Sequence, residues 1–435
     1  MTLFRWKRLL SLASSGLLSV LMVHSIAHGA VHVLQEGDDL QATLDAAQPG
    51  DTIQLKSGQY EGQFVVEVDN LTLIGPEDHS AVLKGPREGR TLWIKSEDVT
   101  VSNLTVSDSG LSLSRMDAGV FLDKTASRAL VENNRILNNL IGVYIWGPQE
   151  AVVQKNYISG TNELRMSERG NGVTIWNSPG SKVLNNDIIN GRDGIFSNTS
   201  KFNVFSGNTF RDLRYGVHYM YTNDSVVSDN VSIDNDIGYA IMFSERIEVL
   251  RNITINSKDQ GVMMNYANHS RVEDNAVHKA EKCVYFYNAN INHITNNHFE
   301  QCEIGVHYTG AAQGNQIYNN SFVYNQTQVK YVGTRYEDWT HEDRGNYWSD
   351  HSGFDLNGDG VSDTAYRPND IIDQVVWRAP SSRILLNSPA VAIVRWAQSQ
   401  FPAILPGGLM DTAPIMLMPE SATYKKLQEL LNERK

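Results

Sequence analysis

Residues 194–215 read GIFSNTSKFNVFSGNTFRDLRY and residues 216–237 read GVHYMYTNDSVVSDNVSIDNDI, so a Gly-apolar pair and a later Asn recur after 22 residues. Both markers continue along the chain in each direction. The pair begins at Gly119, Gly142, Gly172, Gly194, Gly216, Gly238, Gly261 and Gly305, and the Asn marker is Asn134, Asn156, Asn186, Asn208, Asn230, Asn252, Asn275, Asn297 and Asn320. Cys283 takes the missing place in the glycine series, and both series contain a single longer spacing of 30 residues, which indicates one insertion near 161–170.

A fixed period of this length is typical of a solenoid. The units are rich in Val, Ile, Thr, Asn and Gly and lack a 3.6-residue apolar period, so helical repeats are excluded. Each unit contains two or three short strands separated by Asn and Gly turns. We therefore predict an all-β fold, a right-handed single-stranded parallel β-helix of the pectin-lyase-like type, with a helical C-terminal tail. About 12 coils stacked at about 4.8 Å would form a rod roughly 55–60 Å long.

The recurrent asparagine has a physical reason in such a fold. An Asn turned inward at a corner can hydrogen-bond the backbone and adopt the left-handed conformation. Stacked Asn side chains can also satisfy one another along the rod. We expect a continuous Asn ladder from Asn134 to Asn320.

The sequence divides into four parts. Residues 1–29 resemble a Sec-type signal peptide cleaved near Gly29, with a basic start and an apolar run, which predicts a periplasmic protein. Residues 30–330 are the predicted β-helix with an N-terminal capping helix, 331–387 are rich in Asp and Trp, and 388–435 form a helical docking tail. The net charge of −12 argues against a nucleic-acid partner, because binding to phosphates needs a basic surface.

Alternation along the strand that follows each glycine separates inward from outward positions. The first and third positions are mostly apolar and are predicted to fill the bore. The second and fourth positions are then outward, and we call them the aromatic–methionine stripe. They are Phe121, Tyr144, Thr174, Phe196, His218, Ala240, Met263, Tyr285 and His307, and Asp123, Trp146, Trp176, Asn198, Met220, Met242, Asn265, Tyr287 and Thr309. An exposed apolar stripe of this size indicates a binding surface, unless loops or the tail cover it.

Two ligand chemistries fit the stripe. Thioethers and imidazoles suit copper(I), which makes His218, Met220, Met242, Met263 and His307 the candidate copper ligands. Exposed aromatic rings suit sugar chains or a protein partner, and the candidates for this role are Tyr144, Trp146 and Trp176. Cleavage of a glycosidic bond needs a pair of carboxylates, and the stripe offers Asp123 alone, so an enzyme is disfavoured.

Two further features lie outside the stripe. Cys283 and Cys302 fall in different columns, so we favour two unpaired thiols with Cys283 buried, while a disulfide stays open. Residues Asp355, Asn357, Asp359 and Asp363 have the spacing of a calcium loop, although the twelfth position is Tyr366 instead of Glu. A knot of Asx turns without an ion is the alternative.

The tail begins with Ser388 as a helix cap followed by Pro389. An apolar face that includes Ile393, Val394 and Phe401 follows, and a last helix starts at Ser421. Such a tail suits docking to another protein or capping of the last coil.

The signal peptide, the Asn–Gly β-helix, the segment from Gly345-Asn346-Tyr347-Trp348-Ser349-Asp350 through Asp363 and the tail starting at Ser388 together resemble the NosD family of nitrous oxide reductase maturation proteins. The resemblance covers nearly the whole mature chain. It implies a non-catalytic periplasmic assembly factor that works with the permease and ATPase subunits of an ABC transporter and associates with the membrane through them. It also implies that a copper chaperone delivers copper and that nitrous oxide reductase docks to receive its copper–sulfur centre.

The resemblance supplies no ligand set, so the copper stripe and the transporter contact of the tail around 390–418 are interpretations of this sequence alone. A carbohydrate-binding or polysaccharide-cleaving β-helix protein is the alternative function. A pure scaffold, in which the stripe is only a protein interface, is a third.

Overall fold

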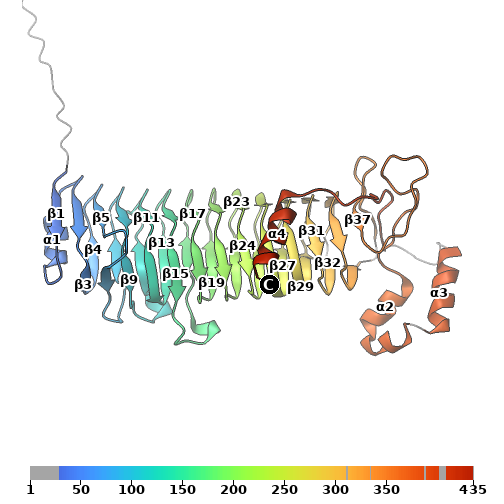
Figure 1. Cartoon of the computed structure of the whole chain (residues 1–435), viewed down its shortest axis with the longest axis horizontal. Helices are drawn as coiled ribbons and strands as arrows, with labels where there is room; N and C mark the ends of the chain where they lie inside the picture. Colours follow the sequence, from blue (N-terminus) through green and yellow to red (C-terminus); the bar gives the residue numbers. More distant parts are fainter. Residues whose placement is uncertain (1–28, 310–311, 334, 387, 401–407, 435) are drawn as a thin grey trace, which may run out of the picture.

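Short parallel strands stack along one long axis in the computed structural model, which describes residues 29–309, 312–333, 335–386, 388–400 and 408–434 (Figure 1). The predicted signal peptide lies outside the described residues apart from Gly29. The coils form a right-handed β-solenoid, as the 22-residue period predicted, with about 14 turns instead of the roughly 12 expected.

Each coil contributes one strand to a 13-stranded wall in which every neighbouring pair is parallel. Its strands are β1 (Val31–Leu34), β2 (Thr52–Leu55), β5 (Thr72–Ile74), β8 (Thr100–Ser102), β11 (Leu130–Glu132), β14 (Val152–Gln154), β17 (Lys182–Leu184), β20 (Val204–Ser206), β23 (Ser225–Ser228), β26 (Ile247–Leu250), β28 (Arg271–Glu273), β30 (His293–Thr295) and β33 (Gln316–Tyr318).

The larger sheet of 23 strands consists of two adjoining walls. The wall that carries the glycine series contains β4 (Phe64–Val66), β7 (Leu92–Ile94), β10 (Ala118–Leu122), β13 (Ile141–Trp146), β16 (Val173–Trp176), β19 (Asp193–Asn198), β22 (Tyr215–Met220), β25 (Ile237–Met242), β27 (Ile253–Asn265), β29 (Ala276–Tyr287), β32 (Ile304–Thr309) and β35 (Thr327–Tyr331). The other wall contains β3 (Gly58–Glu61), β6 (Ala81–Lys84), β9 (Thr105–Ser107), β12 (Arg135–Asn139), β15 (Tyr157–Gly160), β18 (Asp187–Ile189), β21 (Thr209–Arg211), β24 (Val231–Ile233), β31 (His298–Glu300), β34 (Ser321–Val323) and β37 (Tyr347–Trp348), and the long strands β27 and β29 bend across both.

The remaining elements are short. The helices are α1 (Leu40–Ala46), α2 (Ile371–Arg378), α3 (Pro389–Gln400) and α4 (Ala422–Glu433), with single 3-10 turns at η1 (Leu113–Arg115), η2 (Met166–Glu168) and η3 (Pro380–Leu385). A separate two-stranded sheet pairs β36 (Tyr336–Asp338) with β38 (Gly408–Met410). Helix α1 lies at the first coil (Figure 1), where its buried residues Leu40 and Leu44 join the core.

The asparagine series forms a buried ladder. Each side-chain Nδ2 donates to Oδ1 of the next Asn at 2.9 to 3.1 Å, from Asn134 through Asn320. The residue before each ladder Asn has a positive φ, for example 59° at Asp229. The ladder Asn itself does not adopt the left-handed conformation. Our expectation of a left-handed ladder Asn is therefore wrong, because its amide is fully used in the ladder while its neighbour makes the corner.

The glycine series lies where a side chain would meet the backbone of the next coil. A Cβ atom added to Gly216 would lie 2.7 Å from the carbonyl oxygen of Gly238, and one added to Gly238 would lie 2.5 Å from that of Gly261. A larger residue at either position would therefore require a local shift, whereas the place of Cys283 in the series does carry a side chain.

Cys283 and Cys302 form a disulfide with their Cα atoms 5.7 Å apart, so our preference for unpaired thiols is wrong. Both residues are buried, as expected for Cys283. Cys283 lies in β29, in the core of the solenoid, and Cys302 lies between β31 and β32 in the following coil. The disulfide therefore joins two successive coils at a corner, which an alignment of the strand positions does not reveal.

The coil stacking continues beyond residue 330. Strand β37 pairs with β34, and Asn320 donates to Asn346 at 2.9 Å, so Asn346 takes the next place in the ladder. The separation of these two residues is 26 instead of 22 or 23, because the chain leaves the solenoid between them. The extra residues between Asn320 and Asn346 interrupt the 22-residue period, so the sequence pattern ends before the solenoid does.

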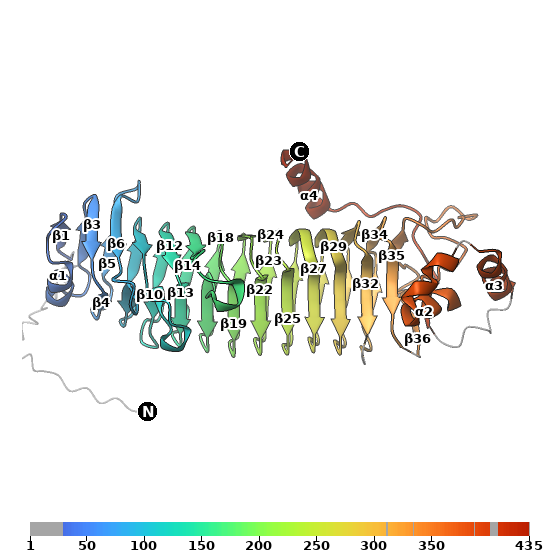
Figure 2. The ribbon, with the colours of Figure 1, turned by 90° about the horizontal axis from the view of Figure 1, so that it is seen from below.

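The last helix returns to the middle of the solenoid. In both views α4 lies beside the central coils, far from the end at which α2 and α3 lie (Figures 1 and 2). Leu427 is fully buried in a cluster with Val231, Ile253 and Ile255, and Ser421 donates to Asp274 at 2.6 Å. Helix α4 therefore covers a side wall and does not cap the last coil.

Candidate functional site

The candidate site lies on the outer face of three neighbouring strands, β22, β25 and β27 (Figure 2). Their register places Ala240 between His218 on one side and Met263 on the other. Met242 follows Ala240 on the same face of β25, and its partner on β22 is Met220. A methyl side chain is therefore surrounded by one imidazole and three thioethers, and we call this group the Ala240 cup.

The four side chains occupy the positions around the alanine. Ala240 is fully buried and His218 is 9% exposed, while Met220, Met242 and Met263 are half-buried. Coils are about 4.8 Å apart, so these side chains start from positions adjacent to Ala240. The smallest residue of the outward column thus lies between larger ones.

His218 is held by a buried carboxylate. Its Nδ1 lies 3.1 Å from Oδ2 of Asp193, and Arg214 donates to both oxygens of the same carboxylate at 2.8 and 2.7 Å. Burial raises the pKa of Asp193, but the hydrogen bonds from His218 and Arg214 outweigh it and hold the pKa below its ordinary value. An ionised carboxylate only accepts, so Nδ1 carries the proton.

The other ring nitrogen of His218 has no partner. The Nε2 atom is buried without a hydrogen bond in the described structure, and a neutral ring that carries its proton on Nδ1 presents a lone pair there. A buried polar atom without a partner is costly unless a ligand satisfies it. A neutral imidazole nitrogen beside thioether sulfurs is a donor set for a soft monovalent metal.

His307 does not belong to this cup. Two coils separate it from Met263, with Tyr285 in the column between them at a ring distance of 5.2 Å from His307. Burial lowers the pKa of His307 to about 4, assisted by the charges of Lys330 and Lys282. The structure therefore splits the five candidate copper ligands into four that lie together and one that stands apart.

The aromatic end of the stripe is partly covered. Phe121 is fully buried in a cluster with Tyr144, Trp146 and Leu164, the last of which comes from the insertion near 161–170. Trp146 and Trp176 stack with centroids 6.0 Å apart, and Trp176 remains 41% exposed. Loop coverage thus explains the apolar character at one end, whereas Trp176 still presents an open face.

The candidate calcium loop is closed by its own hydrogen bonds. Asp355 accepts from the backbone N–H groups of Gly358 and Gly360, Asp363 accepts from that of Leu356, and Asn357 pairs with Asp359. In the described part of the chain, no three His, Cys, Asp or Glu side chains are arranged to hold a metal ion. The loop is therefore the Asx-turn alternative, and calcium is not supported.

The three candidate docking residues of the tail differ in exposure and in whether the structure describes them. Ile393 is 65% exposed and Val394 is also exposed on α3, whereas Phe401 lies outside the described residues. Among the described residues, no helix has the length and apolar character needed to cross a bilayer.

Sequence reasoning missed two groups of charged residues. Asp193 and Arg214 stand just before the glycine column, and extending the alignment back to the residue before each glycine would have revealed the acid. The second group lies under α4, where His278 and His298 bond the two oxygens of Glu300 at 2.6 and 3.0 Å and Tyr424 stacks on His298 at 3.8 Å. Burial raises the pKa of Glu300, but the two imidazoles lower it to about 2.

The comparisons with known proteins agree on one family. The family model described as "Periplasmic copper-binding protein (NosD)" matches residues 154–353. A "Probable ABC transporter binding protein NosD" from Stutzerimonas stutzeri is 38% identical over 86% of this chain and 89% of its own length. A protein of the same description from Pseudomonas aeruginosa is 35% identical over 84% of this chain and 88% of its own length.

A likeness among solved structures concerns the fold. The Dettilon tailspike protein superposes with a TM-score of 0.51 at 13% identity, covering 66% of this chain and 65% of that chain. At this identity the likeness supports the parallel β-solenoid and carries nothing about function.

Proposed function

The chain belongs to the NosD family, and from this premise we propose that it is a periplasmic accessory factor that holds copper(I) transiently in the Ala240 cup. It acts without catalysis, alongside the permease and ATPase of an ABC transporter. A copper chaperone delivers the metal, and the copper goes to the copper–sulfur centre of nitrous oxide reductase.

One observation carries this proposal. The Nε2 atom of His218 is buried without a hydrogen-bond partner among the described residues, Nδ1 is bonded to Asp193, and the strand register places Met220, Met242 and Met263 at the positions around the adjacent Ala240. A set of one imidazole and several thioethers prefers copper(I) over hard cations such as magnesium or calcium. A half-buried site also suits a cargo that must enter and leave.

The surfaces on either side support docking. Trp176 is exposed on the stripe, and we propose that it takes part with Tyr144 and Trp146 in binding a protein partner. On α3, the exposed Ile393 and Val394 give the tail an apolar face, which we propose contacts the transporter and thereby brings the protein to the membrane. His307, with its low pKa, stays neutral over the physiological range and is a candidate for a second copper contact along the column.

The test is a copper(I) titration under anaerobic conditions against a chromophoric competitor. We expect the wild-type chain to bind copper(I) in the cup and the triple variant His218→Ala, Met220→Ala, Met263→Ala to lose that stoichiometric site. Met418→Ala is the matched control, because Met418 is 38% exposed in the tail and lies outside the stripe. Unchanged stoichiometry in the triple variant would remove the cup from the proposal.

A further inference from the structure

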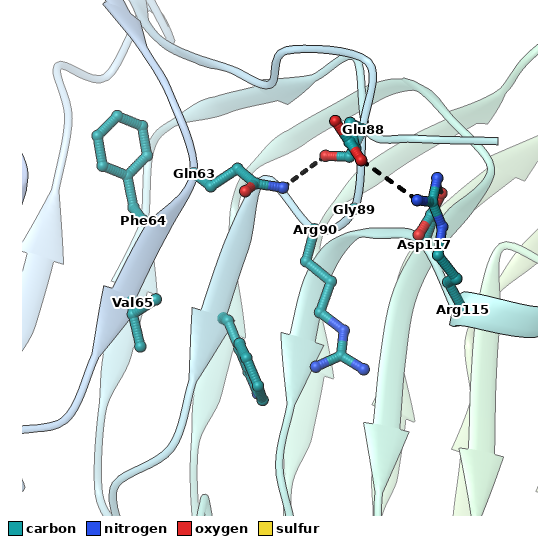
Figure 3. Close-up of a pocket in the computed structure, with 9 residues that line it drawn as sticks. Gln63, Phe64, Val65, Glu88, Gly89, Arg90, Arg115 and Asp117 are labelled. Carbon is teal, nitrogen blue, oxygen red and sulfur yellow. Dashed lines mark hydrogen bonds and ion pairs between the residues drawn. The ribbon is translucent and has the colours of Figure 1, made fainter. Parts of the chain in front are cut away.

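A pocket of about 390 Å³ lies beside β7 and β10, toward the N-terminal end of the solenoid. Its rim comes from the turn that carries Glu88 and Gly89 and from the segment of η1 (Figure 3). Four coils separate this region from His218, roughly 19 Å at about 4.8 Å per coil. The pocket is therefore distinct from the Ala240 cup.

Arg90 brings to the pocket a cation that has no hydrogen-bonded anion. Its guanidinium carbon lies 3.5 Å from the ring centroid of Phe121 and 4.3 Å from that of Trp93. Among the described residues Arg90 has no hydrogen bond and no ion pair, although the carboxylates of Asp123 and Asp117 lie within electrostatic range. Stacking occupies the faces of the planar guanidinium and leaves its N–H donors in the plane free for an anion.

Asp117 brings an acceptor without a donor. The residue is fully buried and lines the pocket. Its Oδ2 accepts from the backbone N–H of Ser112 at 2.9 Å and lies 3.5 Å from Arg115, whereas its Oδ1 is buried without a partner. A buried carboxylate oxygen of this kind needs a hydrogen-bond donor, and none of the residues that the structure describes provides one.

The other charges at the rim are already paired. Arg115 donates to Glu88 at 3.2 Å, and Gln63 donates to the backbone oxygen of Glu88, as Figure 3 shows. Arg90 points away from this group in the same view. On the opposite side Phe64 and Val65 supply an apolar wall.

We propose that this pocket binds a sugar acid, with the carboxylate on Arg90 and a hydroxyl group donating to Oδ1 of Asp117. A phosphate dianion would face both Asp117 and Glu88 and be repelled. A simple carboxylate such as acetate would leave Asp117 without a donor, and a neutral sugar would leave Arg90 without an anion. A sugar acid satisfies both groups and offers C–H surface to Phe64 and Val65.

The test uses the full chain and isothermal titration with D-glucuronate, D-galacturonate, a galacturonate trisaccharide, D-glucose and acetate. We expect saturable binding of at least one sugar acid and affinities at least about tenfold weaker for glucose and acetate. Tighter binding of the trisaccharide than of the monosaccharides would identify the end of a polyuronate chain as the ligand, and equal binding would identify the free sugar acid.

Variants decide whether the pocket is responsible. Arg90→Gln and Asp117→Asn should each weaken sugar-acid binding at least about tenfold. The control is Arg87→Gln, because Arg87 pairs with Glu163 at 2.6 Å on the neighbouring turn and does not line the pocket. Circular dichroism verifies that each variant is folded, and Arg90→Gln decides the question if Asp117→Asn unfolds. No binding of any sugar acid, equal binding of glucose, or unchanged affinity in Arg90→Gln would overturn the proposal.

Discussion

Replacing Asp193 by Asn isolates the role of the carboxylate that bonds His218, the imidazole of the proposed copper site. The substitution preserves the shape of a side chain that is 1% exposed but removes the charge that fixes the imidazole. His218 and Nη2 of Arg214 share Oδ2 of Asp193, whereas Nε of Arg214 uses Oδ1. An amide therefore meets a donor of Arg214 or His218 with its N–H₂ group in either orientation, and the imidazole loses the carboxylate that orients it. Where the N–H₂ group faces His218, Nδ1 accepts, the proton moves to Nε2, and the lone pair of Nε2 is lost.

The expected loss of copper(I) affinity follows from the loss of the group that orients the imidazole. Removal of the partner that orients a metal-binding imidazole typically costs about 10- to 100-fold in metal affinity. This corresponds to about 1.4–2.8 kcal/mol at about 1.4 kcal/mol per decade. We therefore expect Asp193→Asn to bind copper(I) about 10- to 100-fold more weakly, with the three methionines still present.

Two measurements separate this effect from a general loss of structure. Competition titration gives the affinity, and X-ray absorption at the copper edge reports whether an imidazole remains bound. The imidazole contribution should fall in Asp193→Asn and the sulfur contribution should stay. Asp187→Asn is the matched control, because Asp187 forms a half-exposed ion pair with Arg211 on the neighbouring wall. Copper affinity within about threefold of wild type, with the imidazole signal intact, would refute the tautomer argument.

Three further outcomes are expected. Ala240→Leu should crowd the positions around it and weaken copper(I) binding at least about tenfold without removing a ligand, and wild-type affinity in that variant would contradict the cup. Asn230→Leu should lower the free energy of unfolding by about 3–5 kcal/mol, because it leaves the Phe205 carbonyl and neighbouring ladder amides unpaired. Asn256→Leu removes only an exposed bond to Asp234 and places Leu at a positive φ of 55°, so it should cost about 1–2 kcal/mol in denaturant titration. The pKa of Glu300 is lowered from 4.5 to about 2, so its ionised form stabilises the fold above pH 4.5, and this contribution is lost as the pH falls from 4.5 toward 2. Glu300→Gln should therefore flatten the pH dependence of thermal unfolding in that range. An acid slope equal to that of the wild type would contradict the assignment.

The repeat made the fold predictable because one residue period controls every coil. Alternation after each glycine correctly separated bore from surface, as Tyr219 in the core and His218 outside illustrate. The register of β22 and β25 then brought Met220 and Met242 together, as the same alignment implied. Local patterns thus sufficed wherever neighbours in space are one period apart in sequence.

Contacts that do not follow the period could not be predicted. Helix α4 packs on the wall through contacts such as Ser421 with Asp274, which are 147 residues apart in the sequence. No repeat spacing in the sequence indicates that separation. The pairing of Cys283 with Cys302 spans a separation of 19, shorter than one coil, because it crosses a corner. The partner of His218 is Asp193 at a separation of 25, three residues beyond the period, since the acid precedes the glycine while the histidine follows it.

A stack of coils ordinarily frays from its ends, since each terminal coil has only one neighbour. The return of α4 to the wall around Ile253 changes this for the C-terminal end. The chain runs from the final coils, up to Asn346, back to the central wall, so the C-terminal segment is held at a second point while Leu427 stays buried. Release of α4 would therefore remove a tether between the end of the solenoid and the wall that carries the Ala240 cup.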